Sequence, residues 1–249
     1  MNASRFIACI LLISTSALHA KKTDAPKVIP PYKMPSHAWF LQHIVPPPPS
    51  GSWMEKQDVN EVLALQKAAT PKQIALAKWD FNLSVFTFSE VLGKKFTAKR
   101  YPQTAAFFLG LNNLIQKENN FLKSHFKRPH PFEVDPHVKR IVVAPPGYSY
   151  PSYHSARCVV FSNVLAMLDP ANKAAFHQVA EQVEIDRVLA GEHFPSDIRA
   201  GKYLGQLIYA QLLKDKNFLA DLKKVQAAEW TPPPAEVKNL HIAVPSIPK

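Results

Sequence analysis

SYHSARCVVFSNVLAML, residues 152–168, is the stretch that most clearly indicates how this chain folds. It opens on Ser152, a residue type that caps helices by accepting a hydrogen bond from a backbone N–H of the first turn. From Cys158 onward the stretch is apolar on nearly every face, which is typical of a helix enclosed by other helices. The sequence therefore predicts a central, buried helix that begins near Ser152.

Further helix starts lie on both sides of this central stretch. Asp58 with Glu61 forms a capping-box pattern before the run VLALQKAA. Thr70 and Asp169 are N-cap residue types, and each is followed by proline, which suits the first helical position. Pro195 begins a segment in which apolar residues recur at roughly helical spacing. The sequence therefore predicts several helices packed around the central one.

Strand patterns are almost absent, with RIVVA at residues 140–144 as the one candidate, so we expect an all-α fold. Residues 21–52 and 229–249 are rich in proline, which removes a backbone donor and clashes inside helices. We predict that they form extended arms without helices. Between them, residues 53–228 are expected to form a single compact helical domain.

The first twenty residues, MNASRFIACILLISTSALHA, have the layout of a secretory signal peptide. Arg5 supplies an early positive charge, an apolar run follows, and small residues lead to Ala20. The apolar run is too short to cross a bilayer as a helix, although a buried N-terminal helix is an alternative. We expect a periplasmic or secreted protein with no transmembrane segment in its mature chain.

Cysteine and charge content restrict the remaining possibilities. Cys9 lies in the predicted signal peptide, so Cys158 is alone in the mature chain and is expected to be a buried, unpaired residue. The formal net charge of +11 becomes +10 when Arg5 is removed with the signal. Excess positive charge suits an anionic ligand, a nucleic acid or a membrane surface. Because the lysines are scattered, we interpret them as a solvated basic surface and expect no nucleic-acid partner.

Three clusters carry residues suited to phosphate chemistry: KSHFKRPHPF (123–132), SYPSYHSA (149–156) and DRVLAGEHFPSDIRAG (186–201). Lysine and arginine supply donors for phosphate oxygens, and a helix start at Ser152 presents unpaired N–H groups to an anion. His154 and His193 allow one nucleophile and one general acid. Asp197, four residues after His193, could hold that imidazole in one tautomer.

Each of these signals has a structural alternative when it is taken alone. A single histidine before a proline-initiated helix is more often structural than catalytic. An arginine six residues before it usually lies at the surface or in an ion pair. His154, His193 and Asp197 could also be read as a trio of metal ligands, although the sequence has no other metal-ligand spacing. The joint pattern of the three clusters favours a phosphate site.

Taken together, the clusters resemble the phosphatidic-acid-phosphatase type 2 (PAP2) superfamily, which includes bacterial class A acid phosphatases and vanadium haloperoxidases. The family pattern is K-x6-R-P, then P-S-G-H, then S-R-x5-H-x3-D. The residues that match, motif by motif, are Lys123, His130 and Pro131; Pro151, Ser152 and His154; and Arg187, His193 and Asp197. The resemblance runs from about residue 58 to 215, and with the export signal it is most similar to the class A acid phosphatases.

The resemblance implies a fold and a mechanism. The fold would be the all-α domain of the PAP2 and vanadium-haloperoxidase type. His193 would attack phosphorus and form a phosphohistidine, Asp197 would orient it, and His154 would protonate the leaving alkoxide. The expected phosphate-binding residues are Lys123, Arg128, His130, Ser152, Tyr153 and Arg187. The family requires no metal, so we expect no cofactor.

Three positions depart from the family pattern. His130 replaces an arginine and would donate to phosphate only when protonated, so Arg128 is a candidate substitute. Tyr153 replaces a glycine; it keeps the backbone N–H, but its ring would crowd the pocket. Asp186 replaces a serine and would either repel phosphate or turn away to pair with Arg187 or a lysine.

Three functions remain open at this point. The first is a periplasmic acid phosphatase that hydrolyses phosphate monoesters, with altered substrate choice or an acidic pH optimum. The second is a catalytically weakened protein that binds phosphate or an envelope partner, and the third is a vanadate-dependent haloperoxidase. The complete set of His154, His193 and Asp197 favours the phosphatase. Its partner would be a small phosphorylated substrate, and the oligomeric state is open between a monomer and a homo-oligomer.

Overall fold

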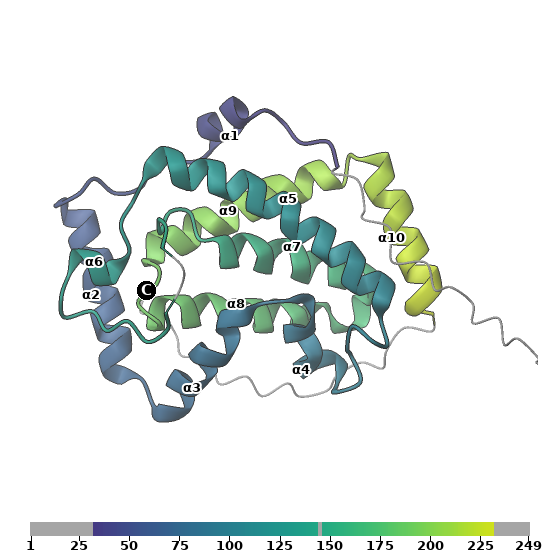
Figure 1. Ribbon diagram of the computed structural model, residues 1–249, viewed down its shortest axis with the longest axis horizontal. Helices are drawn as coiled ribbons and strands as arrows, with labels where there is room; N and C mark the ends of the chain where they lie inside the picture. Colours follow the sequence, from purple (N-terminus) through teal and green to yellow (C-terminus); the bar gives the residue numbers. More distant parts are fainter. Residues whose placement is uncertain (1–31, 144–145, 232–249) are drawn as a thin grey trace, which may run out of the picture.

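The computed structural model describes residues 32–143 and 146–231, which form an assembly of α-helices (Figure 1). In chain order the helices are α1 (His37–His43), α2 (Trp53–Ala68), α3 (Pro71–Trp79), α4 (Ser89–Leu92), α5 (Pro102–Phe126), α6 (Pro131–Val134), α7 (Tyr153–Leu168), α8 (Lys173–Leu189), α9 (Pro195–Leu212) and α10 (Lys216–Glu229). Short 3-10 helices cover Asp80–Asn82, Val85–Phe88 and Pro170–Asn172. The described residues contain no strand, so the all-α prediction is confirmed. The predicted signal peptide and residues 232–249 lie outside the described part.

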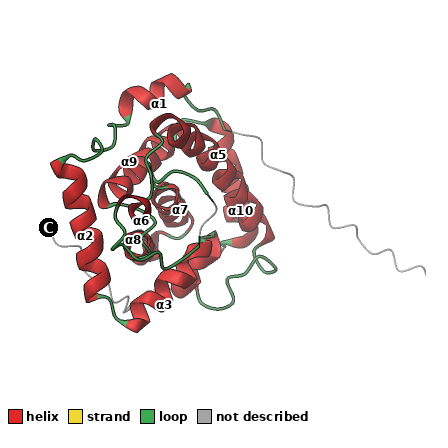
Figure 2. Ribbon diagram, turned by 60° about the vertical axis from the view of Figure 1, so that its left-hand side comes forward, coloured by secondary structure: helices red, strands yellow, loops and turns green. Residues whose placement is uncertain are grey.

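The helix α7 occupies the centre of the molecule, as its sequence predicts. Figure 2 shows α7 and α8 enclosed by α2, α3, α5, α9 and α10. The side chains of α7 are buried on several faces, and they include Ala156, Cys158, Val160, Phe161, Val164 and Leu165. Ser152 is its N-cap, since its Oγ accepts from the backbone N–H of Ser155 at 3.3 Å. Cys158 is a free, fully buried thiol, which confirms the expectation for that residue.

Two glycines let α9 lie directly against the backbone of α7. A Cβ at Gly205 would sit 2.7 Å from the carbonyl oxygen of Ala156, and one at Gly201 would overlap the carbonyl oxygen of Ser152. Any other residue would therefore push the helices apart. The close approach also allows the backbone N–H of Ser152 to donate to the carbonyl of Asp197 at 3.0 Å. As a result, the N-terminal ends of α7 and α9 lie side by side.

The predicted helix starts are confirmed at three places. Thr70 caps α3 and forms a reciprocal capping box with Gln73. Ser152 caps α7, and Pro195 is the first residue of α9. In each case the signal is local, because it depends on a side chain that reaches its own first turn or on a proline whose φ already suits a helix.

Two other predicted starts are wrong. Asp58 lies inside α2, which begins at Trp53 with Ser52 as its N-cap, and the Asp58 carboxylate is buried. Asp169 precedes the 3-10 helix Pro170–Asn172, and its side chain makes no capping hydrogen bond. The helix α8 begins only after this turn, at Lys173. An acidic residue followed by proline therefore marked a turn here rather than the α-helix itself.

The described part of the N-terminal arm also differs from its prediction. Between the two proline clusters, residues 37–43 form α1, with Ser36 as the N-cap. Phe40 and Ile44 are buried in the main core, and this apolar contact stabilises a short helix that propensity alone would not support. Residues 140–143 of the candidate strand are irregular, and Ile141 N donates to the carbonyl of Ala190 rather than to a strand. Residue 144 lies outside the described residues.

Candidate active site

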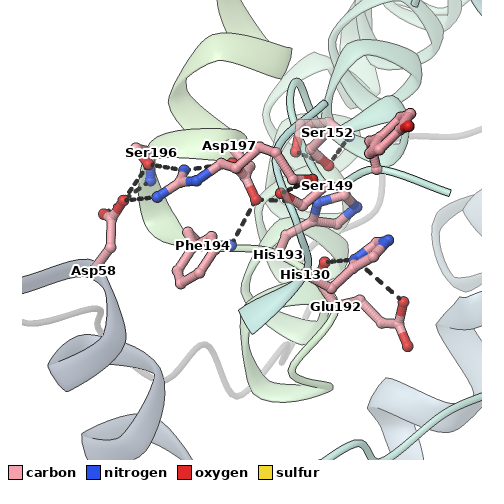
Figure 3. A network of polar contacts seen from close by, with 12 residues as sticks. Asp58, His130, Ser149, Ser152, Glu192, His193, Phe194, Ser196 and Asp197 are labelled. Atoms are coloured by element: carbon pink, nitrogen blue, oxygen red, sulfur yellow. Dashed lines mark hydrogen bonds and ion pairs between the residues drawn. The ribbon is translucent and has the colours of Figure 1, made fainter. Parts of the chain in front are cut away.

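The three sequence clusters meet where α7 and α9 begin and α5 and α8 end (Figure 3). Lys123 lies in the last turn of α5, and His130 immediately precedes α6. His154 is in the first turn of α7, while Arg187 is in the last turn of α8. Between α8 and α9, a short loop carries His193. The fold thus gathers residues from separate helices around one helix N-terminus, which is a favourable place for an anion.

His193 is buried beside Asp197. Its Nδ1 lies 3.5 Å from Oδ2 of Asp197, which is within ion-pair range but longer than an ordinary hydrogen bond, and Nδ1 has no hydrogen-bond partner among the described residues. Burial lowers the pKa of His193 to about 4, and positive charge from Lys123 acts in the same direction, against the opposing effect of Asp197. The imidazole is therefore neutral at mildly acidic and neutral pH. Because Nδ1 faces Asp197, Nε2 is the nitrogen available for nucleophilic attack.

Asp197 is the third residue of α9 and is completely buried. Its Oδ2 accepts from the backbone N–H of Phe194 at 2.9 Å, and its Oδ1 accepts from Nη1 of Arg128 at 2.6 Å. Burial opposes its charge, but the adjacent His193 ring and the positive charge of Arg128 outweigh that effect and lower the pKa of Asp197. The carboxylate therefore remains ionised and can orient the imidazole.

His154 lies against the segment that follows α3. Its Nε2 is 3.1 Å from the carbonyl oxygen of Phe81, and because a carbonyl only accepts, Nε2 carries the proton. Burial places the pKa of His154 well below the ordinary value, and the charges of Arg187 and Arg157 lower it further. The resting side chain is therefore a neutral imidazole, and a bound anion would raise its proton affinity.

Lys123 and Arg187 are the cations in the last turns of α5 and α8. Nζ of Lys123 donates to the carbonyl of Tyr148, and burial lowers its pKa to about 8, against the attraction of Asp197 and Glu192. Arg187 is 1% exposed, and its Nη2 donates to the carbonyl of Ala77 at 2.5 Å. Its Nε and Nη1 have no hydrogen-bond partner among the described residues. Buried donors of this kind are costly unless a ligand accepts from them.

Ser152 and Tyr153 form the helix start near these cations. The Oγ of Ser152 accepts from the backbone N–H and the Oγ of Ser155, so its own hydroxyl hydrogen remains available to donate. The ring of Tyr153 lies under the guanidinium of Arg157 at 4.3 Å, and its hydroxyl donates to Oδ1 of Asn112 at 2.9 Å. Tyr153 is thus held by the residues of α5 and α7, and its backbone N–H stays at the helix start.

His130 lies close to His193, with 5.9 Å between the ring centroids. Its Nδ1 is 2.6 Å from the carbonyl oxygen of Glu192, and its ring stacks on Phe132. Because a carbonyl accepts, Nδ1 carries a proton, which leaves Nε2 for any further contact. The residue that replaces the family arginine is therefore near His193, but one of its nitrogens is already bonded to the Glu192 carbonyl.

Asp186 follows neither of the alternatives raised by the sequence. Its side chain is hydrogen-bonded to Asp80, and its Oδ1 accepts from Nε2 of Gln182 at 3.0 Å. Burial, together with the neighbouring Asp80 carboxyl, raises the pKa of Asp186 to about 9. The two acids therefore share a proton, and Asp186 carries no charge at acidic pH. Sequence reasoning missed Asp80, because its partner is more than a hundred residues away.

Arg128 is bound to carboxylates on two sides. Its Nη1 donates to Oδ1 of Asp197 and to Oγ of Ser196, both at 2.6 Å, and its Nη2 donates to Oδ2 of Asp58 at 3.0 Å. Its guanidinium also lies 3.9 Å over the ring centre of Phe194. This geometry favours a role in holding Asp197 over the phosphate contact that the sequence suggests.

Sequence reasoning also missed the function of Asp58 and Ser196, which complete this network (Figure 3). A signal for Asp58 was present, since it lies on the same helical face as the buried Val62 and Leu65. An acidic residue on an apolar stripe indicates a buried partner.

Within the described residues, no group of three or more His, Cys, Asp and Glu side chains could hold a metal ion. No helix in the same part of the chain is long and apolar enough to cross a membrane.

Comparison with known proteins agrees with the motifs. Residues 103–218 match the family model of the PAP2 superfamily. The chain is 27% identical over 233 residues to a non-specific acid phosphatase of Salmonella typhi, covering 87% of this chain and 90% of that protein. It is also 27% identical over 224 residues to a non-specific acid phosphatase of Salmonella typhimurium, covering 83% of this chain and 86% of that protein. Over residues 103–218 the helical domain described above is therefore similar to the PAP2 superfamily, as its motifs indicate.

Proposed function

We propose that this protein is an acid phosphatase that hydrolyses phosphate monoesters through a phosphohistidine on His193, without a metal cofactor. The observation that carries the proposal is a buried, neutral imidazole beside an ionised carboxylate and near a guanidinium with unpaired donors. A group that only bound phosphate would have no use for a neutral, oriented nucleophile. The names of the two relatives support the same activity.

The phosphoryl group would be held by donors from several helices. The Nε and Nη1 of Arg187, the ammonium of Lys123 and the hydroxyl of Ser152 would donate to its oxygens. The free N–H groups at the start of α7 would add to this positive field, because the first turn of a helix has no internal acceptors for them. His130 would contribute a further donor through Nε2 only when its ring carries a second proton, because the first is on Nδ1. Such preorganised donors stabilise charge that develops in the transition state.

The reaction would proceed in two displacements. When the substrate anion binds, His154 takes up a second proton from water on Nδ1, because its Nε2–H is bound to the Phe81 carbonyl. Nε2 of His193 then attacks phosphorus, forming a nitrogen–phosphorus bond while the ester oxygen leaves and takes that proton from His154. Water then attacks the phosphohistidine, His154 accepts a proton from it, and inorganic phosphate departs as the imidazole is released. Asp197 stabilises the positive charge that the His193 ring carries while it is phosphorylated. Both histidines return to their starting protonation states.

The proposal extends to location and substrate. The signal-like N-terminus supports export to the periplasm or beyond, where the substrate would be a small phosphorylated compound. Sugar phosphates, nucleotides and lipid phosphates all present the same terminal group to this site. A phosphate-release screen across these ester classes between about pH 4 and 8 would define the substrate class.

The test compares wild type with His193→Ala. Wild type should release phosphate from a chromogenic aryl phosphate, vanadate should inhibit competitively, and EDTA should leave the rate unchanged. His193→Ala should lose turnover while keeping a wild-type circular dichroism spectrum. Full activity in His193→Ala would exclude the proposed nucleophile, and loss of activity in EDTA with recovery in zinc would exclude a metal-free mechanism.

A second candidate function, phosphate binding without turnover, draws support from His130. The family arginine is absent there, and the histidine has one nitrogen bound to the Glu192 carbonyl. Loss of a charged donor costs about 3 to 4 kcal/mol in the transition state. This candidate predicts that calorimetry detects phosphate binding while no ester class is hydrolysed.

A further inference from the structure

The two oxygens of Asp197 have different partners. Oδ2 accepts from the backbone N–H of Phe194 and lies nearest His193, whereas Oδ1 accepts only from Arg128 among the hydrogen bonds of the described residues. The carboxylate therefore cannot rotate without breaking a charged hydrogen bond at 2.6 Å. Its orientation toward the imidazole depends on where Arg128 lies.

Arg128 is itself held firmly. Its Nη2 donates to Asp58 from α2, and the Asp58 carboxylate also accepts from the N–H and Oγ of Ser196. The ring of Phe194 packs against the guanidinium face. On the backbone side, Ser149 N donates to the Arg128 carbonyl at 2.9 Å. The network joins α2, the segment after α5 and the start of α9 (Figure 3).

A forked guanidinium suits this task better than an ammonium. Two carboxylates, Asp58 and Asp197, lie on different terminal nitrogens of one planar group. Lysine keeps the charge but has a single nitrogen, so it cannot reproduce the planar geometry. All three side chains are almost fully buried. A buried network of this kind is a costly way to gain stability, and it is better explained by the geometry that it specifies.

We propose that Arg128, anchored by Asp58, is a positioning residue for the nucleophile: it fixes Asp197 so that only Oδ2 faces His193. Its positive charge also limits how strongly Asp197 favours a protonated imidazole. The nucleophile is therefore oriented by a carboxylate without being held in its inactive, protonated form. This inference rests on the proposed function, which assigns His193 as the nucleophile.

Loss of Arg128 should raise the pKa of His193. An Asp197 carboxylate without its cation would attract a proton to His193 more strongly, so His193 would remain protonated to a higher pH. The other titratable groups around this pair are Lys123 from α5, Tyr150, His130 and Glu192 from the surrounding loops, and His154 from α7. Those groups are unchanged in an Arg128 variant, so a shift reports on Arg128 itself.

The experiment compares Arg128→Gln and Arg128→Lys with wild type in the full chain. Nitrogen NMR titration of the His193 imidazole gives its pKa without requiring turnover, and kcat is measured on an aryl phosphate. In Arg128→Gln the pKa should rise by about one unit, with kcat lowered about tenfold or more. Arg128→Lys should keep a pKa near that of wild type, yet its kcat should fall about tenfold because the fork is lost.

The matched control is Arg199→Gln. Arg199 is 67% exposed at its side chain and lies 3.5 Å from Oδ1 of Asp58, and among the described residues no hydrogen bond or ion pair joins it to Asp197. Its loss should leave both the His193 pKa and kcat unchanged. If Arg128→Gln fails to fold, Arg128→Lys decides the matter, since wild-type kcat in that variant overturns the proposal. An unchanged His193 pKa in a folded Arg128→Gln protein would overturn it as well.

Failure of this inference is distinguishable from failure of the proposed function. If wild type forms a phosphohistidine while the Arg128 variants behave like wild type, only the positioning role is lost. If wild type forms no phosphohistidine and releases no phosphate, the proposed function itself fails, whatever the NMR titration shows.

Discussion

Arg128 and Arg187 are both almost fully buried, with 4% and 1% exposure, yet their surroundings differ. The terminal nitrogens of Arg128 donate to two carboxylates and a hydroxyl of the protein. Arg187 donates to one backbone carbonyl, and two of its nitrogens have no partner among the described residues. Nε of Arg128 also has no partner among the described residues, so the two arginines differ at their terminal nitrogens: both are paired in Arg128, whereas Nη1 of Arg187 is not. A buried cation whose terminal nitrogens are paired within the protein maintains the scaffold, whereas one with an unpaired terminal nitrogen is suited to a ligand.

The largest expected effect is the loss of activity when Arg187 is replaced. Arg187→Gln should lower kcat/KM by about a hundredfold to a thousandfold, because it removes a charged donor aimed at the phosphoryl group. Phosphate should also no longer raise the melting temperature of that variant, since stabilisation by a ligand requires binding to the folded state. Thermal unfolding with and without phosphate provides the measurement. Equal stabilisation of wild type and Arg187→Gln would contradict the assignment.

The next effect is a difference between Arg128 and Arg187 variants in the free energy of unfolding. Arg128→Gln leaves the carboxylates of Asp58 and Asp197 buried without their cation, which should cost about 3 to 5 kcal/mol in the free energy of unfolding. Arg187→Gln removes a cation that makes one hydrogen bond within the described residues, to the Ala77 carbonyl, so its unfolding free energy should change by much less. Urea unfolding of both variants without phosphate makes the comparison. If Arg187→Gln lowered the free energy of unfolding more than Arg128→Gln, Arg128 could not be assigned to the structure and Arg187 to the ligand.

The site cations and the nucleophile together set a pH window. With a pKa of about 4, His193 is protonated and inactive only in stronger acid, and Lys123 loses its charge above its pKa of about 8. The profile of kcat/KM should therefore rise through about pH 4 and fall through about pH 8. Lys123→Gln should remove the alkaline limb and lower the plateau. An alkaline limb that persists in that variant would assign it to another group.

The smallest expected effects concern the departures from the family motifs. His130→Arg should raise kcat/KM at pH 7 by up to about tenfold, because it restores a permanent charge near His193. Asp186→Ser should change activity by less than about twofold in acid, since the Asp186 carboxyl is paired with Asp80 and uncharged there. Steady-state rates at pH 5 and pH 7 distinguish them. A large gain from Asp186→Ser alone would indicate that Asp186 does repel the substrate.

Features encoded locally could be predicted from the sequence. Ser152, Thr70 and Pro195 act within their own helical turn, and Asp197 in the first turn of α9 lies near His193 because His193 directly precedes the N-cap of that helix. The all-α fold and the central position of α7 likewise follow from the absence of strand patterns and from its apolar faces. These predictions depend on residues only a few positions apart, for which no tertiary information is needed.

Features that depend on distant partners could not be predicted. The sequence suggests Arg128 as a phosphate ligand. Its actual partners, the carboxylates of Asp58 and Asp197, could not be foreseen because each is about seventy residues away in sequence. Asp186 was expected to meet phosphate, Arg187 or a lysine, and its pairing with Asp80 depends on how α3 and α8 pack. The short helix α1 forms between prolines because Phe40 and Ile44 enter the core. In each case tertiary contacts decide among local alternatives.

The central claim is that His193 carries the phosphoryl group, and its most direct test is trapping that group on the residue. Wild type would be mixed with a labelled phosphate monoester at about pH 5, quenched, and digested under mildly alkaline conditions that preserve phosphohistidine. We predict an acid-labile phosphoryl group on the peptide that contains His193, with none in His193→Ala. A label on any other residue, or rapid phosphate release by wild type with no trapped label and undiminished turnover in His193→Ala, would contradict it.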